Sequence, residues 1–161
     1  MTRRFPLGFK LLLLAMLCGI GCTRPPTNAT VYVYRLDGEY YDKAPENEES
    51  PIEPPANNVH EWPILESKQI TDSRLAAELC AAIADARNFG GNDLPDCFWP
   101  GMAIAIDDGE KTEAIICLKC DRVKFYRGGR DADEKNLSER GHQEFARLFA
   151  MAFPEQPKPP Q

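Results

Sequence analysis

The sequence predicts an α+β fold: a small antiparallel sheet of three to four strands with two helices packed on one face, preceded by a disordered spacer. Two observations predict this class. Apolar residues recur at helical spacing in residues 75–86 and again in residues 145–152. Between these segments lie short apolar or alternating runs that are separated by turn residues, which is typical of antiparallel strands.

The first two elements are a strand and a helix. Residues 62–70 mix polar and apolar side chains on both faces of an extended chain, which predicts an irregular or edge strand. Residues 71–73 offer helix caps, and Leu75, Leu79 and Ile83 then recur on one face of a helix. Gly90, followed by a second glycine, is expected to end that helix.

Three strands and a helix follow. The apolar runs 102–106 and 112–117 flank an Asp-Gly turn, which predicts a β-hairpin. Residues 121–127 alternate apolar and polar side chains and predict a third strand. Ser138 offers the start of a last helix, whose apolar stripe ends before a proline at position 154.

The chain divides into four regions. Residues 1–21 have the layout of a secretory signal peptide, and residues 22–58 form an anchor and spacer that is acidic and proline-rich. Residues 59–153 form the small α+β domain, and residues 154–161 form a disordered tail. Within the spacer region, residues 30–36 alternate like a strand, and the sequence leaves open whether they join the sheet of the later domain.

The first twenty-two residues predict export. Arg3, Arg4 and Lys10 precede an apolar run that is too short to cross a bilayer as a helix. The small residues before Cys22 suit cleavage at that point, and the segment resembles the lipobox of bacterial lipoprotein precursors, with Gly19 where that family usually has Leu. The resemblance implies lipidation of the Cys22 thiol and a lipid-anchored protein of the cell envelope. Cleavage by an ordinary signal peptidase, which would give a soluble periplasmic or secreted protein, remains the alternative.

Charge limits the classes of partner. Residues 1–21 contain three basic residues and no acidic residue, so the remaining chain has sixteen basic and twenty-five acidic residues and a net charge of −9. Nucleic-acid binding is not expected, because Lys and Arg contacts to phosphate supply most of that affinity. Anionic lipid headgroups would also repel the chain, so the membrane is expected as a partner only through the lipid on Cys22.

Three cysteines of the domain are candidate site residues: Cys97, Cys117 and Cys120. A disulfide from Cys97 to either of the other two would stabilise a small core in an oxidising compartment. A zinc site is the second reading, because C-x-x-C between strands presents two thiolates, with Cys97 as a third ligand and His142 as a weak fourth. Thiol–disulfide exchange by Cys117 and Cys120 is the third, although such pairs normally precede a helix and residues 121–127 predict a strand.

The order CF-x-P, apolar hairpin and IC-x-x-C, carried by Cys97, Cys117 and Cys120, resembles a group of uncharacterised bacterial exported proteins. The resemblance implies a fold and a compartment and no reaction. We therefore predict an exported, membrane-anchored lipoprotein whose domain has a non-enzymatic binding or structural role and needs no cofactor. A zinc-binding or thiol-redox domain is the alternative, so whether the chain is an enzyme remains open. No ligand or protein partner is predicted.

Overall fold

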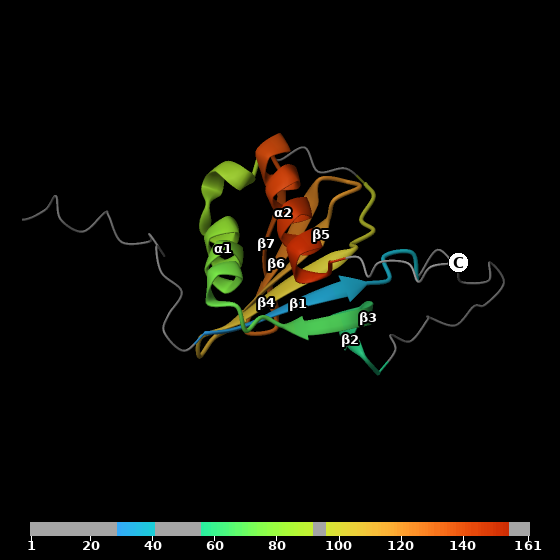
Figure 1. Cartoon of the computed structure of the whole chain (residues 1–161). Coiled ribbons are helices and arrows are strands. Elements are labelled where there is room, and N and C mark those ends of the chain that lie inside the picture. The colour runs from blue at the N-terminus through green and yellow to red at the C-terminus, as the bar shows by residue number, and fades with distance from the viewer. Residues whose placement is uncertain (1–28, 41–55, 92–95, 155–161) are drawn as a thin grey trace, which may run out of the picture.

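The computed structural model describes residues 29–40, 56–91 and 96–154. In this part of the chain two helices lie against one antiparallel sheet of seven strands, which curls into a half-barrel (Figure 1). The spatial order of the strands is β2-β3-β1-β4-β5-β6-β7. The strands are β1 (Thr30–Leu36), β2 (Asn58–Val59), β3 (Trp62–Gln69), β4 (Met102–Asp107), β5 (Lys111–Cys117), β6 (Arg122–Arg127) and β7 (Arg130–Asn136). The helices are α1 (Ser73–Ala84) and α2 (Glu139–Ala152), with a short 3-10 turn, η2 (Ala86–Asn88), after α1.

The predicted sheet of three to four strands is wrong, because the sheet has seven. β1 lies near the middle of the sheet and pairs with both β3 and β4. β7 follows β6 as an antiparallel neighbour, although its sequence RDADEKN has no apolar face. β2 adds a short pairing at the opposite edge. β1 contributes the buried Val31 and Val33 to the core, whereas β7 is held by backbone hydrogen bonds to β6 without a hydrophobic face of its own.

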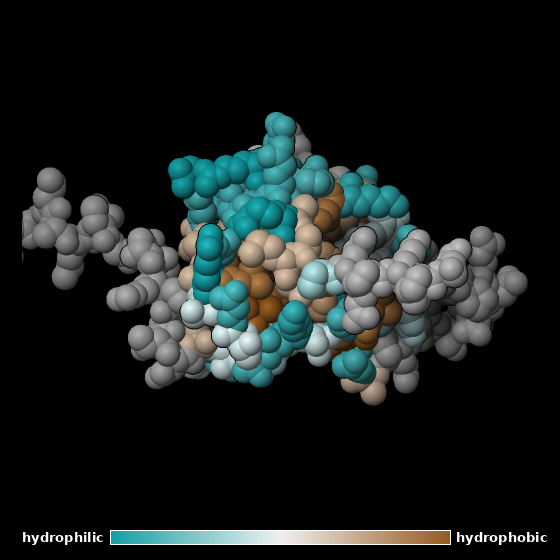
Figure 2. All heavy atoms as spheres, viewed as in Figure 1, coloured by the Kyte–Doolittle hydropathy of each residue, from teal (hydrophilic) through white to brown (hydrophobic). Residues whose placement is uncertain are grey.

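Strand alternation divides the apolar residues of the sheet between two faces. One face packs beneath α1 and α2. Its fully buried side chains include Val33, Ile104 and Ile116, and Phe145 of α2 is fully buried in the same core. Figure 2 shows hydrophilic side chains on the outer surface of the helices and hydrophobic ones beneath, where the helices meet the sheet. We call the opposite side of the sheet the open face, because neither helix covers it.

The open face has a smaller apolar cluster of its own. Its buried members come from β1, β2, β3, β4, β5 and β6: Leu36, Val59, Trp62, Ala103, Ile115 and Tyr126. Phe98, in the segment before β4, packs against this cluster, with its ring centroid 6.0 Å from that of Trp62. The segment before β4 therefore folds back over this side of the sheet.

Both helices begin where the sequence offers a cap. The Asp72 side chain accepts hydrogen bonds from the backbone N–H groups of the first turn of α1, and Ser138 does the same for α2. The end of α1 differs from the expectation, because the helix stops at Ala84 instead of reaching Gly90. Asp85 is extended and caps η2, which turns the chain before the glycines are reached.

The contact between η2 and α2 is very close. A Cβ atom added at Gly141 would lie 1.9 Å from the backbone oxygen of Asn88, so only glycine permits this approach. Asn88 is buried, and its side-chain amide donates a hydrogen bond to the carbonyl of Ala82 at the end of α1. This contact fixes the position of α2 relative to the end of α1.

Candidate functional site

The three candidate cysteines lie at one end of the sheet. Cys117 is the last residue of β5, Cys120 lies in the turn between β5 and β6, and Cys97 lies in the segment that leads to β4. Cys117 is fully buried and Cys120 nearly so, whereas Cys97 is half-buried. The structure thus brings together three residues, the first and last of which are twenty-three positions apart in the chain.

The shortest contact in this group joins Cys97 and Cys120, whose Sγ atoms lie 2.8 Å apart. This separation is far below the van der Waals contact of two sulfur atoms, and a small closure would form a disulfide. The pKa of the Cys97 thiol is raised, first because it hydrogen-bonds to Cys120 and then because of desolvation. A raised pKa disfavours the thiolate that nucleophilic exchange requires.

Cys117 has a different role in the turn. Its sulfur accepts a hydrogen bond from the backbone N–H of Cys120, with 3.2 Å between nitrogen and sulfur. Asp121, at the end of this turn, has a positive φ of 50°, which lets the chain reverse direction tightly. As the sequence predicts, a strand follows the C-x-x-C pair, whereas redox pairs of this kind normally precede a helix.

The weak candidate His142 does not join the cysteines. Its ring Nδ1 pairs with the carboxylate of Asp121, and its side chain is 43% exposed on α2. Within residues 29–40, 56–91 and 96–154, no group of three or more His, Cys, Asp or Glu side chains is arranged to hold a metal ion. The fourth cysteine of the domain, Cys80, lies on α1 and packs against the helix-side core.

Two aromatic side chains next to Cys97 carry cations over their rings. Lys119 Nζ lies 4.6 Å from the ring centroid of Trp99, and Lys124 Nζ lies 4.8 Å from that of Phe98. The guanidinium of Arg122 also lies over Phe98, 5.5 Å from its centroid. These cation–π contacts hold the segment that contains Cys97 against the turn and β6.

A second polar cluster, which the sequence did not predict, lies on the open face around Glu113. Glu113 is 4% exposed, in the middle of β5. One of its carboxylate oxygens lies 2.7 Å from Lys111 Nζ, and the other lies 3.0 Å from His60 Nε2. Burial of a carboxylate costs free energy unless hydrogen-bond or charge partners compensate for its lost hydration. Lys111 and His60 are these partners for Glu113. Because Lys111 is partly buried, desolvation lowers its pKa, but the hydrogen bond and charge of Glu113 outweigh that effect and leave the pKa raised.

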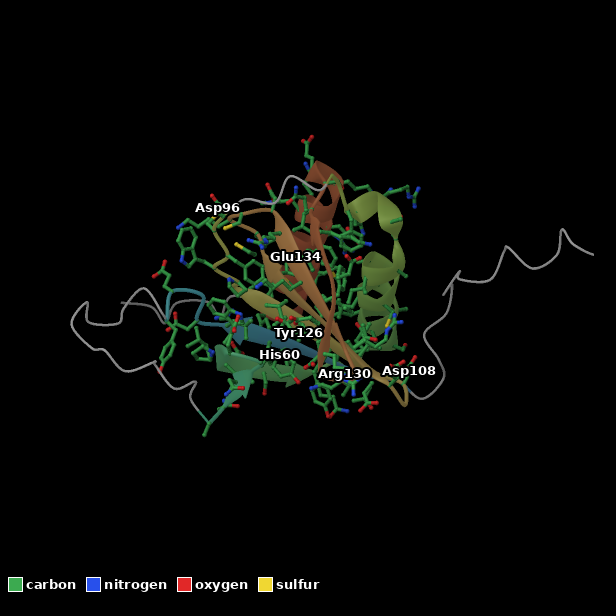
Figure 3. All side chains as sticks on the ribbon, turned by 180° about the vertical axis from the view of Figure 1, so that it is seen from behind. His60, Asp96, Asp108, Tyr126, Arg130 and Glu134 are labelled. Atoms are coloured by element: carbon green, nitrogen blue, oxygen red, sulfur yellow. The ribbon has the colours of Figure 1, made fainter. Side chains whose placement is uncertain are left out.

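His60 reaches Glu113 from the two-residue turn between β2 and β3. Its φ of 56° lies in the left-handed region that residues other than glycine rarely adopt. Its ring stacks on Tyr126 of β6, with 3.5 Å between centroids, and Figure 3 shows the two side by side. Since β1, β4 and β5 separate β3 from β6 in the sheet, the turn folds across the open face. Burial, followed by the charge of Asp131, raises the pKa of Tyr126 to about 12.

The predictions for the amino-terminal region lie outside the described residues. These are the signal peptide of residues 1–21 and the lipidated Cys22. In the described part of the chain, neither helix has the length and apolar character needed to span a bilayer.

Comparison with known proteins gives no match. No protein-family model matches the chain, and neither a curated protein nor a solved structure is significantly similar to it.

Proposed function

We propose that the chain is an exported protein of the cell envelope, anchored through a lipid on Cys22, whose domain has a non-enzymatic binding or structural role. The observation that carries this proposal is the contact between Cys97 and Cys120, with 2.8 Å between their sulfur atoms. Paired thiols of this kind form structural disulfides in compartments that are oxidising. The predicted signal peptide would deliver the chain to such a compartment.

Formation of the disulfide balances simply. The thiols of Cys97 and Cys120 lose two protons and two electrons as the sulfur–sulfur bond forms. The electrons reduce the disulfide of an exchange partner, such as a protein thiol oxidase or glutathione disulfide, to two thiols. The product would connect the segment before β4 to the turn between β5 and β6, closing the end of the open face.

The side chains of the domain that could act as nucleophiles, acids or bases are engaged in contacts that favour a structural role. The pKa of Cys97 is raised, which opposes nucleophilic thiol chemistry at neutral pH. Glu113, the most buried acidic side chain described, is engaged by both Lys111 and His60. His60 in turn stacks on Tyr126. These contacts stabilise the fold, which supports a non-enzymatic binding or structural role for the domain.

Two measurements on protein from the native host test the proposal. Mass spectrometry of non-reduced peptides is expected to find Cys97 linked to Cys120, with Cys117 and Cys80 as thiols. One equivalent of zinc that is lost in Cys97→Ser would instead support the metal-binding alternative and contradict the disulfide.

The anchor is tested by fractionation. Wild-type protein is expected in the membrane fraction, and Cys22→Ser is expected to release it. Cys18→Ser is the matched control, because it changes a cysteine of the signal peptide that is removed on cleavage, and it should leave the protein in the membrane fraction. Wild-type protein that is already soluble after export would contradict lipidation.

A further inference from the structure

A cleft of about 470 Å³ lies on the helix side of the sheet, between the end of α1, η2 and the strands β6 and β7. It exists because the two helices do not cover the last strands completely. On β6, Val123 is fully buried, whereas Phe125, two residues further on the same face, is only partly buried. The volume lies within the range of about 300–1,000 Å³ that is typical of small-molecule sites.

Aromatic and aliphatic side chains form the inner wall of this cleft. Phe89 and Phe125 meet edge to face, with 5.4 Å between centroids, and Phe89 also contacts the buried Phe145 at 6.2 Å. Ile83 and Ala84, from the last turn of α1, line the opposite side. The wall therefore offers an apolar surface, with the two rings nearly perpendicular to each other, and it is backed by the core.

The rim of the cleft is positively charged on balance. Lys135 and Arg127 line it together with a single acidic residue, Asp133. Lys135 Nζ lies 5.7 Å from the ring centroid of Phe89 and 6.0 Å from that of Phe125, so the cation is directly above the aromatic wall. It also lies 3.1 Å from a carboxylate oxygen of Asp133, which is 53% exposed at the edge of the sheet.

The ion pair at the rim shows what Lys135 can bind. The pKa of Asp133 is lowered chiefly by its hydrogen bond to Lys135, so a carboxylate already occupies one side of the ammonium group. An ammonium group has three donors, and a second carboxylate above the rings would use another of them. The net charge of the whole chain is −6, so the positive charge of this rim is opposite in sign to that of the chain.

We propose that this cleft binds a small aromatic carboxylate, whose ring packs in the corner between Phe89 and Phe125 and whose carboxylate binds Lys135. The inference rests on the proposed binding role of the domain and names its ligand class. It does not depend on the lipid or on the disulfide, so the fractionation and mass-spectrometry results are independent of its test.

The test uses 2-naphthoate and calorimetry, with the full chain carrying Cys22→Ser so that detergent is unnecessary. Saturable binding is expected, with a dissociation constant on the order of 0.1 mM for a ligand of this size. Lys135→Met keeps the apolar stem and removes the charge, and it should weaken binding roughly tenfold. The uncharged analogue 2-naphthalenemethanol should bind both proteins equally.

Matched variants separate the cleft from the rest of the surface. Ala84→Trp fills the cleft and should abolish binding, whereas Ala81→Trp, at an exposed position of α1 outside the cleft, should leave it unchanged. Lys124→Met removes a charge from the opposite face of β6 and should also have no effect. The proposal is overturned if naphthoate shows no saturation up to about 2 mM. Equal affinity in wild type and Lys135→Met, or in wild type and Ala84→Trp, would also overturn it.

Discussion

Reduction of the proposed disulfide between Cys97 and Cys120 is expected to destabilise the domain by a calculable amount. The bond would close a loop of twenty-four residues, counting both cysteines. The loss of loop-closure entropy in the unfolded chain then predicts a contribution of about 3.4 kcal/mol to the free energy of unfolding. A loss of this size is a large part of the stability that a small domain commonly has.

The assay is urea denaturation of the oxidised protein with and without dithiothreitol, followed by tryptophan fluorescence. Dithiothreitol should lower the free energy of unfolding of the wild type by about 2–4 kcal/mol. It should have no effect on Cys97→Ser, which should resemble the reduced wild type. Cys80→Ser is the control, because it changes a cysteine of α1 and should keep the response to reductant. A response below about 1 kcal/mol in the wild type would refute the reasoning, since no other disulfide is proposed.

Three further predictions concern packing and charge. Gly141→Ala should destabilise the domain by roughly 3 kcal/mol because its Cβ would overlap a backbone oxygen of η2, whereas Gly91→Ala, with nothing within 4 Å, should be tolerated. Glu113→Gln should cost roughly 1–2 kcal/mol in urea denaturation because an amide loses the ion pair, and Glu110→Gln in the exposed turn should cost nothing measurable. The pKa of Tyr126 is raised to about 12 in the folded state, so the unfolded chain loses its phenolic proton first and stability should fall between about pH 10 and 12. Denaturation measured across that range should show a smaller fall in Tyr126→Phe, and an identical fall would contradict this explanation.

Elements with local signals were predicted well from the sequence. The hairpin of β4 and β5 pairs as expected, with Gly109 at a positive φ of 111° in its turn. The apolar stripe of α2 buries Phe145, Leu148 and Ala152, as its spacing predicts. In each case the information lies within a few residues, namely a cap, a turn glycine or a periodic stripe.

The strands that the sequence left open or did not predict are held by partners distant in sequence or by pairing alone. β1 alternates as a strand should, but its position between β3 and β4 depends on later chain segments, the nearer of which begins only at Trp62. β7 carries charges on both faces, so its sequence resembles a solvated loop. Its pairing with β6 supplies what its side chains do not. Charged residues on an edge strand also discourage pairing with other chains, which explains why β7 can carry so many of them.

The cluster around Glu113 had one signal in the sequence. An acidic residue interrupts the apolar run of β5, and a buried carboxylate requires a compensating cation. Lys111 is its neighbour on the same face of that strand, so one partner was within reach of local reasoning. His60 lies fifty-three residues away and reaches Glu113 only because the sheet curls and the β2–β3 turn crosses it. That contact depends on a strand order that the sequence does not give.

The two faces of the sheet differ in the segments that cover them and in the apolar surface that remains exposed. On the open face, the turn that contains His60 and the segment that contains Cys97 both fold over the sheet and are fixed by specific contacts. On the helix side, α1 ends at Ala84 and the aromatic wall beyond it remains partly exposed beneath Lys135. Reduction of the proposed disulfide should thus lower stability while leaving naphthoate affinity unchanged at low temperature, because the cleft shares no residue with the cysteine cluster. Coupled loss of both would show that closure of the open face also determines the shape of the cleft.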